Sequence, residues 1–167
     1  SDSQDVEIEV ERLPQRRRQL RASISIPAPS ERVWQVLTDY DRLAEFIPSL
    51  QESCCIGEAD GCRLLRQVGV EKFLRLSFSA AVVLKMNETP PNRIDFVMTE
   101  GDFNEFEGSW ELAIAADTQV PQVRLTYVLR LQPPRRMPAR LIEGRLRQNL
   151  CANLLAIRQE ACTGVAQ

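Results

Sequence analysis

The sequence contains no histidine among its 167 residues. Histidine is the usual general base near neutral pH, the usual partner of a catalytic serine or cysteine, and the commonest metal ligand. The five cysteines form no CxxC pair, and Cys54, Cys55 and Cys62 lack a fourth ligand at the spacing of a structural zinc site. We therefore expect no metal site and no cofactor, and we assign no catalytic residue.

Long apolar runs are also missing. The longest aliphatic stretch, AAVVL at 80–84, is far shorter than the roughly 20 residues that a membrane-spanning helix needs. The odd number of cysteines and the adjacent Cys54-Cys55 pair argue against a secreted disulfide scaffold and favour a reducing compartment. We expect a cytoplasmic protein. Because the sequence opens with SDSQD and without Met, the plastid stroma stays open as an alternative, reached if a transit peptide was removed.

Positive charge is not in excess. The net charge of −2 argues against a nucleic-acid binder. The arginines are nevertheless clustered, and their ordinary role in such clusters is a solvated surface. A transient contact with an anionic membrane surface stays open as an alternative, and the sequence indicates no oligomeric state. The two Arg-rich segments contain Arg16, Arg17, Arg18 and Arg21, and Arg135, Arg136, Arg140, Arg145 and Arg147.

Seven stretches show the period of two that is typical of strands. VEIEVE at 6–11 alternates apolar and acidic residues, and QLRASISI at 19–26 places Leu20, Ala22 and Ile24 on one face. Short turn sequences separate the later stretches, so consecutive strands are expected to be antiparallel neighbours. The later strands are predicted over residues 62–70, 73–86, 93–99, 106–114 and 122–131.

Two short helices are predicted between the second and third of these strands. Val33, Val36 and Leu37 form an apolar stripe at helical spacing. The second helix, over about residues 41–46, has to end because Pro48 disfavours helical geometry in the residue before it.

A long helix is predicted over residues 139–161, with Ile142, Leu146 and Leu150 on one apolar stripe. A curved antiparallel sheet has one apolar face to cover, and a single long helix can cover it. We therefore predict an α+β fold in which about seven strands wrap around this helix, while the two short helices close one end. A hollow remains between sheet and helix if the facing side chains do not fill it.

Four stretches along the chain carry a family resemblance. They are IPAPSERVWQVLTDYDRLAEFIP (26–48), LLRQVG (64–69), FEGSWEL (106–112) and LIEGRLRQNLCANLLAIRQ (141–159). These stretches resemble the START-like (SRPBCC) superfamily, in its polyketide cyclase/dehydrase and coenzyme Q-binding branch. GDFNEFEGSW (101–110) is similar in particular to cyanobacterial and plastid members. The resemblance implies a helix-grip fold in one domain over residues 1–167, with residues 1–16 as an extra strand and turn, and a family that binds lipids, quinones, polyketides or hormones.

The candidate ligand-binding residues are those that we expect to face the hollow. Asn153 falls about 20° from Leu146 on the helical wheel, and a buried amide needs a hydrogen-bond partner. That partner is a strand carbonyl, a buried water or a ligand. Arg66 shares a strand face with Leu64 and Val68, so it either points inward toward a head group or lies at a sheet edge. The full set is Arg66, Phe78, Phe96, Phe106, Trp110, Tyr127, Leu146, Asn149, Leu150 and Asn153; for each aromatic residue, simple core packing is the alternative.

The expected function is binding or transport of a hydrophobic small molecule, such as a lipid, quinone, isoprenoid or polyketide-like compound. Enclosing an apolar ligand gains about 25 cal/mol per Å² and needs no catalytic apparatus. The alternative is a cyclase or dehydratase acting on a polyketide-like chain in the same space. In that case the candidate proton-steering residues are Tyr40, Tyr127, Arg66, Asp102 and Glu105, although no pair of carboxylates stands out as an acid/base couple.

Overall fold

The computed structural model describes residues 5–73, 76–115 and 119–163, and of residues 71–73 and 76–78 it describes the backbone alone. In these ranges two strands, short helices, a run of strands and a long helix follow one another, as the sequence predicts. The elements are β1 (Glu7–Arg12), β2 (Arg18–Ile26), α1 (Ser30–Thr38), the 3-10 helix η2 (Tyr40–Arg42), α2 (Leu43–Phe46), β3 (Leu50–Ala59), β4 (Cys62–Phe73), β5 (Leu76–Thr89), β6 (Arg93–Gly101), β7 (Glu105–Ile114), β8 (Val123–Gln132) and α3 (Ala139–Thr163).

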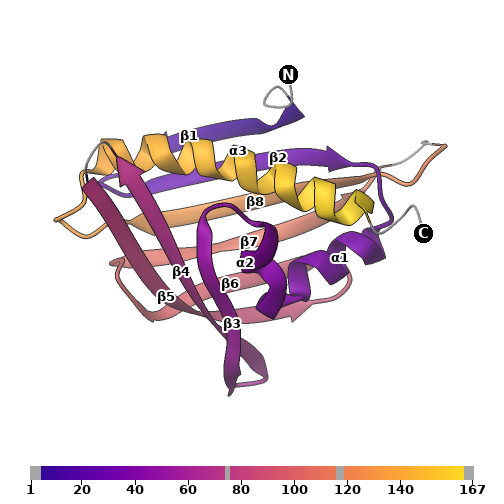
Figure 1. The fold of residues 1–167 in the computed structure, drawn as a ribbon, viewed down its shortest axis with the longest axis horizontal. Helices are drawn as coiled ribbons and strands as arrows, with labels where there is room; N and C mark the ends of the chain where they lie inside the picture. The colour runs from indigo at the N-terminus through magenta and orange to yellow at the C-terminus, as the bar shows by residue number, and fades with distance from the viewer. Residues whose placement is uncertain (1–4, 74–75, 116–118, 164–167) are drawn as a thin grey trace.

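The described strands form one sheet of eight, in the order β1-β2-β8-β7-β6-β5-β4-β3 (Figure 1). Every pair is antiparallel, which confirms the prediction from the short turns. From β3 to β8 each strand pairs with the next along the chain. The hairpin β1–β2 joins at the other side through β2 and β8, where Leu20 lies opposite Leu129 and Ile24 opposite Leu125. Residues far apart in the sequence thus lie side by side in the sheet.

The eighth strand, β3, is the one that the sequence analysis missed. Its sequence contains few large apolar residues, and Ser53 is the one residue of the strand that is fully buried. It lies at an edge of the sheet, and its pairing with β4 shifts register between Leu50 and Glu52 and again between Cys55 and Gly57. Each such bulge moves the alternation of side chains by one residue. The regular period of two is therefore not visible in this stretch.

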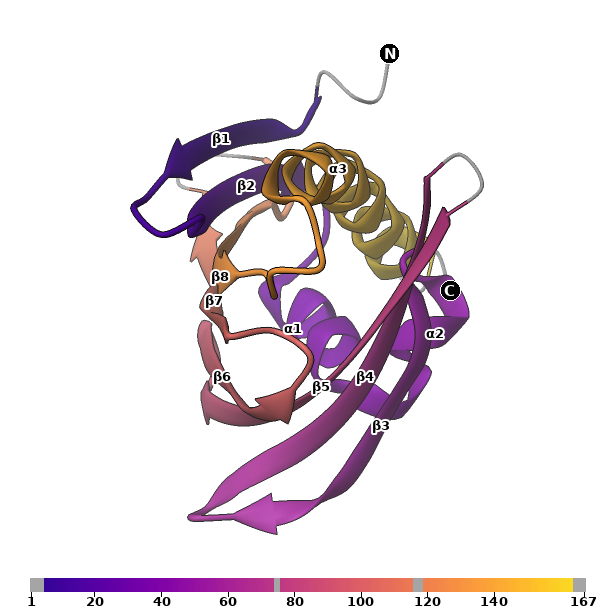
Figure 2. The ribbon, with the colours of Figure 1, turned by 90° about the vertical axis from the view of Figure 1, so that its left-hand side faces the viewer.

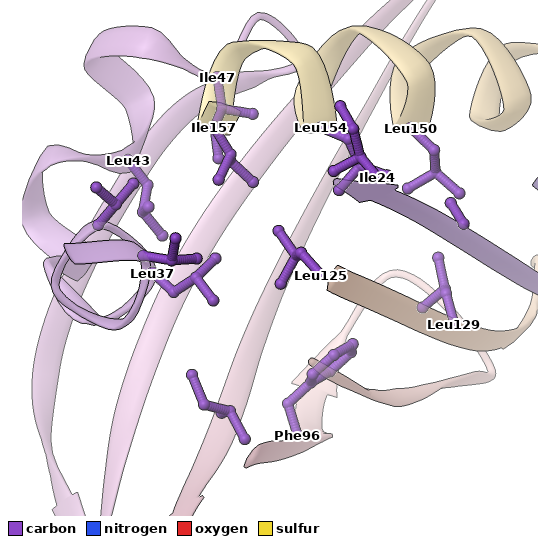
Figure 3. Close-up of a cluster of buried hydrophobic side chains, with 14 of the residues drawn as sticks. Ile24, Leu37, Leu43, Ile47, Phe96, Leu125, Leu129, Leu150, Leu154 and Ile157 are labelled. Carbon is purple, nitrogen blue, oxygen red and sulfur yellow. The ribbon is translucent and has the colours of Figure 1, made fainter. Parts of the chain in front are cut away.

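The long helix α3 covers the concave face of the sheet (Figures 1 and 2). The predicted range of 139–161 is confirmed, and the helix continues to Thr163. Figure 3 shows the apolar side chains of α3 above those of β2 and β8, among them Ile24, Leu125 and Leu129. The α3 residues buried in this contact are Ile142, Leu150, Leu154, Ile157 and Ala161.

The short helices form a lid beside the C-terminal half of α3 (Figure 1). The backbone leaves helical geometry at Asp39, where ψ is 68°, and becomes helical again at η2. α2 stops before Ile47, which is extended with ψ of 115° because Pro48 follows it. Because of the break, α1 and the η2–α2 segment each turn an apolar face inward. The lid therefore covers more of the sheet than one straight helix would. It buries Val33, Val36, Leu37, Tyr40 and Leu43.

β1 extends the sheet alongside α3. Val6 is buried, and Ile8 and Val10 pack against the core, while Glu7 and Glu9 are exposed. The predicted half-buried strand at residues 6–11 is thus confirmed. The apolar face of β1 packs against the core, and its acidic face points to solvent.

The hairpin β1–β2 also fastens the start of α3. The guanidinium groups of Arg12 and Arg18 donate to the carboxylate of Glu143, at 3.1 and 2.7 Å. Arg16, in the turn between the two strands, donates to the backbone carbonyls of Pro133 and Pro134 at 3.3 and 3.4 Å, and also to that of Met137. The segment that leads into α3 is therefore held by side chains from the opposite end of the chain.

None of the described helices combines the length and the apolar character that crossing a bilayer requires. The five cysteines are all free thiols. Cys54, Cys55 and Cys62 lie on β3 and β4, whereas Cys151 and Cys162 lie on α3.

Candidate functional site

A hollow of about 210 Å³ lies between the concave face of the sheet and α3. Figure 2 shows the sheet curling around the space beneath this helix. The lid closes one end with Leu37, Leu43 and Ile47, which Figure 3 shows near Ile157 of α3. Among the lining residues Arg145 alone is charged, so the interior is apolar with a few neutral polar groups.

One side of the hollow is an aromatic wall, formed by the rings of Phe103, Phe106, Phe96, Tyr127 and Trp110. Neighbouring rings are 5.2, 6.1, 5.7 and 4.3 Å apart between centroids in that order. Phe96 and Tyr127 are stacked with 14° between their planes. Such offset and tilted contacts suit the quadrupoles of the rings. The wall therefore presents a continuous row of aromatic surface to the hollow.

Strand register explains the order of these rings. Trp110 on β7 lies directly opposite Tyr127 on β8, and Phe96 on β6 lies opposite Gly108 on β7. Gly108 has no side chain, so the ring of Phe96 can lie over it and reach Tyr127. A Cβ atom on Gly108 would overlap the carbonyl group of Val128 and come within 2.9 Å of Phe96 Cζ.

The opposite wall belongs to α3 and contains Leu146, Asn149, Leu150 and Asn153. The amide of Asn153 donates to Ser49 Oγ at 3.0 Å, and that hydroxyl donates back to Asn153 Oδ1 at 3.2 Å. The sequence alone leaves the partner open between a strand carbonyl, a buried water and a ligand; in the structure the partner is the serine that precedes β3. Asn149 has no hydrogen bond to any residue in the described part of the chain.

Tyr127 is a hydrogen-bond donor without a partner. Its hydroxyl makes no hydrogen bond within the described ranges, and neither does the indole N–H of Trp110. No side-chain nitrogen or oxygen in the described structure is both fully buried and unpaired, so both groups touch open space. Burial raises the pKa of Tyr127, which keeps the phenol protonated at neutral pH and able to donate.

Tyr40 connects the lid to the sheet beside the hollow. Its hydroxyl donates to the carboxylate of Glu88 at 2.7 Å, and Arg63 donates to the same carboxylate at 2.8 Å. The Arg63 guanidinium also lies 4.5 Å from the centre of the Tyr40 ring, a cation–π contact. Burial, together with the bond to Glu88, raises the pKa of Tyr40. This tyrosine is a structural donor that is already occupied.

Most of the predicted site residues line the hollow, one does not, and one cannot be compared. Arg66 is exposed, and its neighbours Leu65 and Gln67 line the hollow instead. β4 is therefore turned opposite to the parity assumed from Leu64 and Val68. The side chain of Phe78 lies outside the described residues. The residues that do line the hollow are Phe96, Phe106, Trp110, Tyr127, Leu146, Asn149, Leu150 and Asn153; their contact with a ligand stays a prediction.

The register between β4 and β5 gives the reason for the error at Arg66. Leu65 lies opposite Leu84, and Gln67 opposite Val82. Paired residues share a face, so the even-numbered apolar face of β5 brings the odd-numbered residues of β4 inward. The apolar pattern of β5 was the available signal, but it becomes informative for β4 only when the pairing is known.

The acidic candidates for proton transfer do not lie in the hollow. Asp102 is exposed and accepts the backbone N–H of Ala81 at 2.8 Å, and Glu105 pairs with Arg17 at 3.0 Å. Arg145, which lines the hollow, donates to Gln148 at 3.2 Å. In the described part of the chain no three histidine, cysteine, aspartate or glutamate side chains are grouped so that they could hold a metal ion.

Solved structures with the same architecture cover nearly the whole chain. A protein from Thermus thermophilus has a TM-score of 0.74 at 20% identity, over 87% of this chain and 98% of its own. The Zhui aromatase/cyclase from a Streptomyces species has a TM-score of 0.70 at 19% identity, over 89% of this chain and 96% of its own. A STAR-related lipid transfer protein from Xanthomonas axonopodis has a TM-score of 0.74 at 16% identity, over 96% of both chains. The helix-grip fold expected from the START-like resemblance is confirmed.

Comparison of the sequence with curated proteins gives no significant match. A family model described as polyketide cyclase/dehydrase and lipid transport matches residues 26–158. The matched residues begin at the last residue of β2 and end within α3, so they include the lid, the aromatic wall and the helix that faces it. With this match, the sheet, lid and gripping helix identify the chain as a member of the polyketide cyclase/dehydrase and lipid transport family.

Proposed function

We propose that the chain binds a hydrophobic small molecule in the hollow and carries it in solution or to a partner. The observation that supports this most directly is the aromatic wall facing an apolar helix across an unfilled space of about 210 Å³. Concave, mostly apolar sites with a few placed polar groups are typical of ligand pockets. Each Å² of apolar surface removed from water contributes about 25 cal/mol to binding.

The polar groups of the hollow fit binding better than acid–base catalysis. The pKa values of Tyr40 and Tyr127 are raised, away from neutrality. Efficient general acids and bases have pKa values near the working pH. Both tyrosines therefore act as hydrogen-bond donors.

A second candidate is a cyclase or dehydratase that shapes a polyketide-like chain in the same space. The family description and the likeness to an aromatase/cyclase support this candidate, as do the free donors of Tyr127 and Asn149 beside the hollow. The coenzyme Q-binding branch and the relation to cyanobacterial and plastid members stay predictions from the sequence.

Filling the hollow tests the proposal. Val82 lines the hollow on β5, and Val82→Phe places a ring in the space that the ligand needs. We expect it to weaken ligand binding at least tenfold, which corresponds to about 1.4 kcal/mol. The measurement is native mass spectrometry of freshly purified protein, followed by calorimetric titration with quinones, fatty acids and small aromatic compounds.

The matched control is Val97→Phe. Val97 is exposed on β6, and the same substitution there leaves the hollow as it is. Circular dichroism checks that both variants keep their fold. Wild-type affinity in a folded Val82→Phe protein would contradict binding in this hollow. Turnover of a polyketide-like substrate that depends on Tyr127 would favour the second candidate.

A further inference from the structure

We infer, on the basis of the proposed function, that the hollow selects a neutral compound with a single planar ring and a hydrogen-bond acceptor such as a carbonyl group. The volume of the hollow sets the size of the ligand, the aromatic wall its shape, and the free donors its polarity. These properties separate such a compound from a long-chain lipid, which the hollow does not enclose.

The volume corresponds to a small ligand. An apolar cavity of about 150 Å³ holds one benzene molecule. Scaling by volume, the hollow of about 210 Å³ holds roughly eight non-hydrogen atoms. A ring with a short substituent has this size. The chain of hexadecanoic acid or the isoprenoid tail of a quinone exceeds it and has to project out of the hollow.

The aromatic wall favours a flat, unsaturated ligand. Phe96 and Tyr127 lie nearly parallel, and Trp110 continues the row on the other side of Tyr127. A planar ring can extend this row by offset or edge-to-face contacts, each of which adds to the gain from buried area alone. A saturated ring of equal size obtains the buried area without the ring contacts.

The free donors define the polar end of the ligand. The phenol of Tyr127 stays protonated, and the indole N–H of Trp110 can only donate. Both touch open space and have no partner within the described residues. The Tyr127 hydroxyl is not sealed in the interior, so a ligand acceptor can bond to it in place of solvent.

The charge of the lining favours a neutral ligand. Arg145 is the one charged residue among the described lining residues, and it already donates to Gln148. Away from Arg145, an ionised ligand would lose its hydration without gaining an ion pair, which is costly. A ketone or quinone-type carbonyl meets the donors at a much smaller desolvation cost.

Four probes test these properties by calorimetric titration of the full chain. Acetophenone has the ring and the carbonyl group, ethylbenzene lacks the carbonyl group, cyclohexyl methyl ketone lacks the aromatic ring, and benzoate carries a charge. We expect acetophenone to bind roughly three- to tenfold more tightly than ethylbenzene. We expect acetophenone to bind more tightly than cyclohexyl methyl ketone by the same factor. Benzoate is expected to be the weakest ligand of the four.

A matched pair of variants locates the donor. Tyr127→Phe removes one of the free donors, so the preference for acetophenone over ethylbenzene should fall, with the affinity for ethylbenzene unchanged. Tyr40→Phe removes the hydroxyl that already donates to Glu88. It should leave the preference for acetophenone intact.

The outcomes separate this inference from the proposed function. Tight binding of hexadecanoic acid together with no binding of acetophenone would overturn the inference and leave the proposed function standing. Absence of binding for every probe and for a total lipid extract would overturn both. Equal affinities for acetophenone and ethylbenzene would overturn the requirement for a hydrogen-bond acceptor. Equal affinities for acetophenone and benzoate would overturn the preference for a neutral ligand.

Discussion

Gly108 shows how much of the site depends on one missing side chain. The ring of Phe96 lies where a Cβ atom on residue 108 would come within 2.9 Å of it, and the carbonyl of Val128 is closer still. The backbone of β8 and the aromatic wall therefore both rely on glycine at this position.

Substitution of two glycines by alanine is expected to have opposite effects. Gly108→Ala forces Phe96 and β8 apart and should lower the free energy of unfolding by about 1–3 kcal/mol. Gly144 is exposed in α3, and a methyl group added there would have no neighbouring atom within 4 Å. Gly144→Ala should raise the free energy of unfolding by about 0.5–1 kcal/mol because alanine favours the helix. Urea denaturation measures both. A stable Gly108→Ala protein with unchanged aromatic circular dichroism would contradict the packing described.

At this scale the sequence predicts side-chain direction well where a strand alternates regularly. Phe96, Trp110 and Tyr127 were placed correctly from parity alone. Arg66 lies neither inward nor at a sheet edge, since it is exposed and β4 lies between β3 and β5. Its direction cannot be read from the sequence because β4 has apolar residues on both faces, among them Leu65 and Val68. Ser49, the partner of Asn153, could not be found from the sequence, since it comes from a loop and the contact depends on the path of the chain.

At the scale of elements, the hairpin β1–β2 acts on α3 through Glu143. The hydrogen bond from Arg12 and the nearby charge of Arg18 lower the pKa of this carboxyl group. A carboxyl group whose pKa is lower in the folded state stabilises the fold at neutral pH. It loses this contribution as the pH falls below its ordinary value of 4.5.

Glu143→Gln is therefore expected to lower stability in a pH-dependent way. The variant leaves Arg18, which is 9% exposed, without its carboxylate, and we expect a loss of about 1–2 kcal/mol at pH 7. The difference from wild type should be smaller at pH 3 than at pH 7, because Glu143 loses its charge progressively as the pH falls below 4.5. Thermal unfolding at both pH values measures it.

Asp60→Asn is the control for Glu143→Gln. It breaks the ion pair with Lys85, in which Asp60 is 81% exposed, and should leave thermal unfolding nearly unchanged because exposed pairs contribute little. A pH-independent loss in Glu143→Gln would show that the ion pairs are not the source of the effect.

Elements with a strong apolar pattern were predictable, and those without one were not. α3 was predicted to within two residues of its end because its stripe and Pro138 mark its course. β3 was missed because bulges interrupt its alternation and its position at the edge leaves most of its side chains exposed. The end of the lid was predictable from Pro48, because a proline disfavours helical geometry at Ile47 and so ends the second short helix.

At the scale of the whole molecule, the structure divides the two Arg-rich segments. In the first, Arg16, Arg17 and Arg18 are engaged by carbonyls and carboxylates of the same chain, and only Arg21 is exposed. In the second, four arginines just before α3 and in its first half are exposed. They are Arg135, Arg136, Arg140 and Arg147.

The prediction of a transient membrane contact therefore narrows to the second segment. We expect the chain to sediment with phosphatidylserine-containing vesicles at low salt, at about 1 kcal/mol per engaged arginine, and to be released as salt screens the charges. Replacing the four exposed arginines with glutamine should abolish sedimentation, and phosphatidylcholine vesicles are the control. Binding that persists at high salt would contradict an electrostatic contact.

The order of elements along the chain has a consequence for synthesis. The sheet and the lid are translated before α3. The apolar concave face of the sheet therefore stays uncovered until α3 emerges from the ribosome. Exposed surface of this kind attracts chaperones and invites aggregation. A small molecule that binds at this stage contacts the open concave face of the sheet and is enclosed when α3 packs over it.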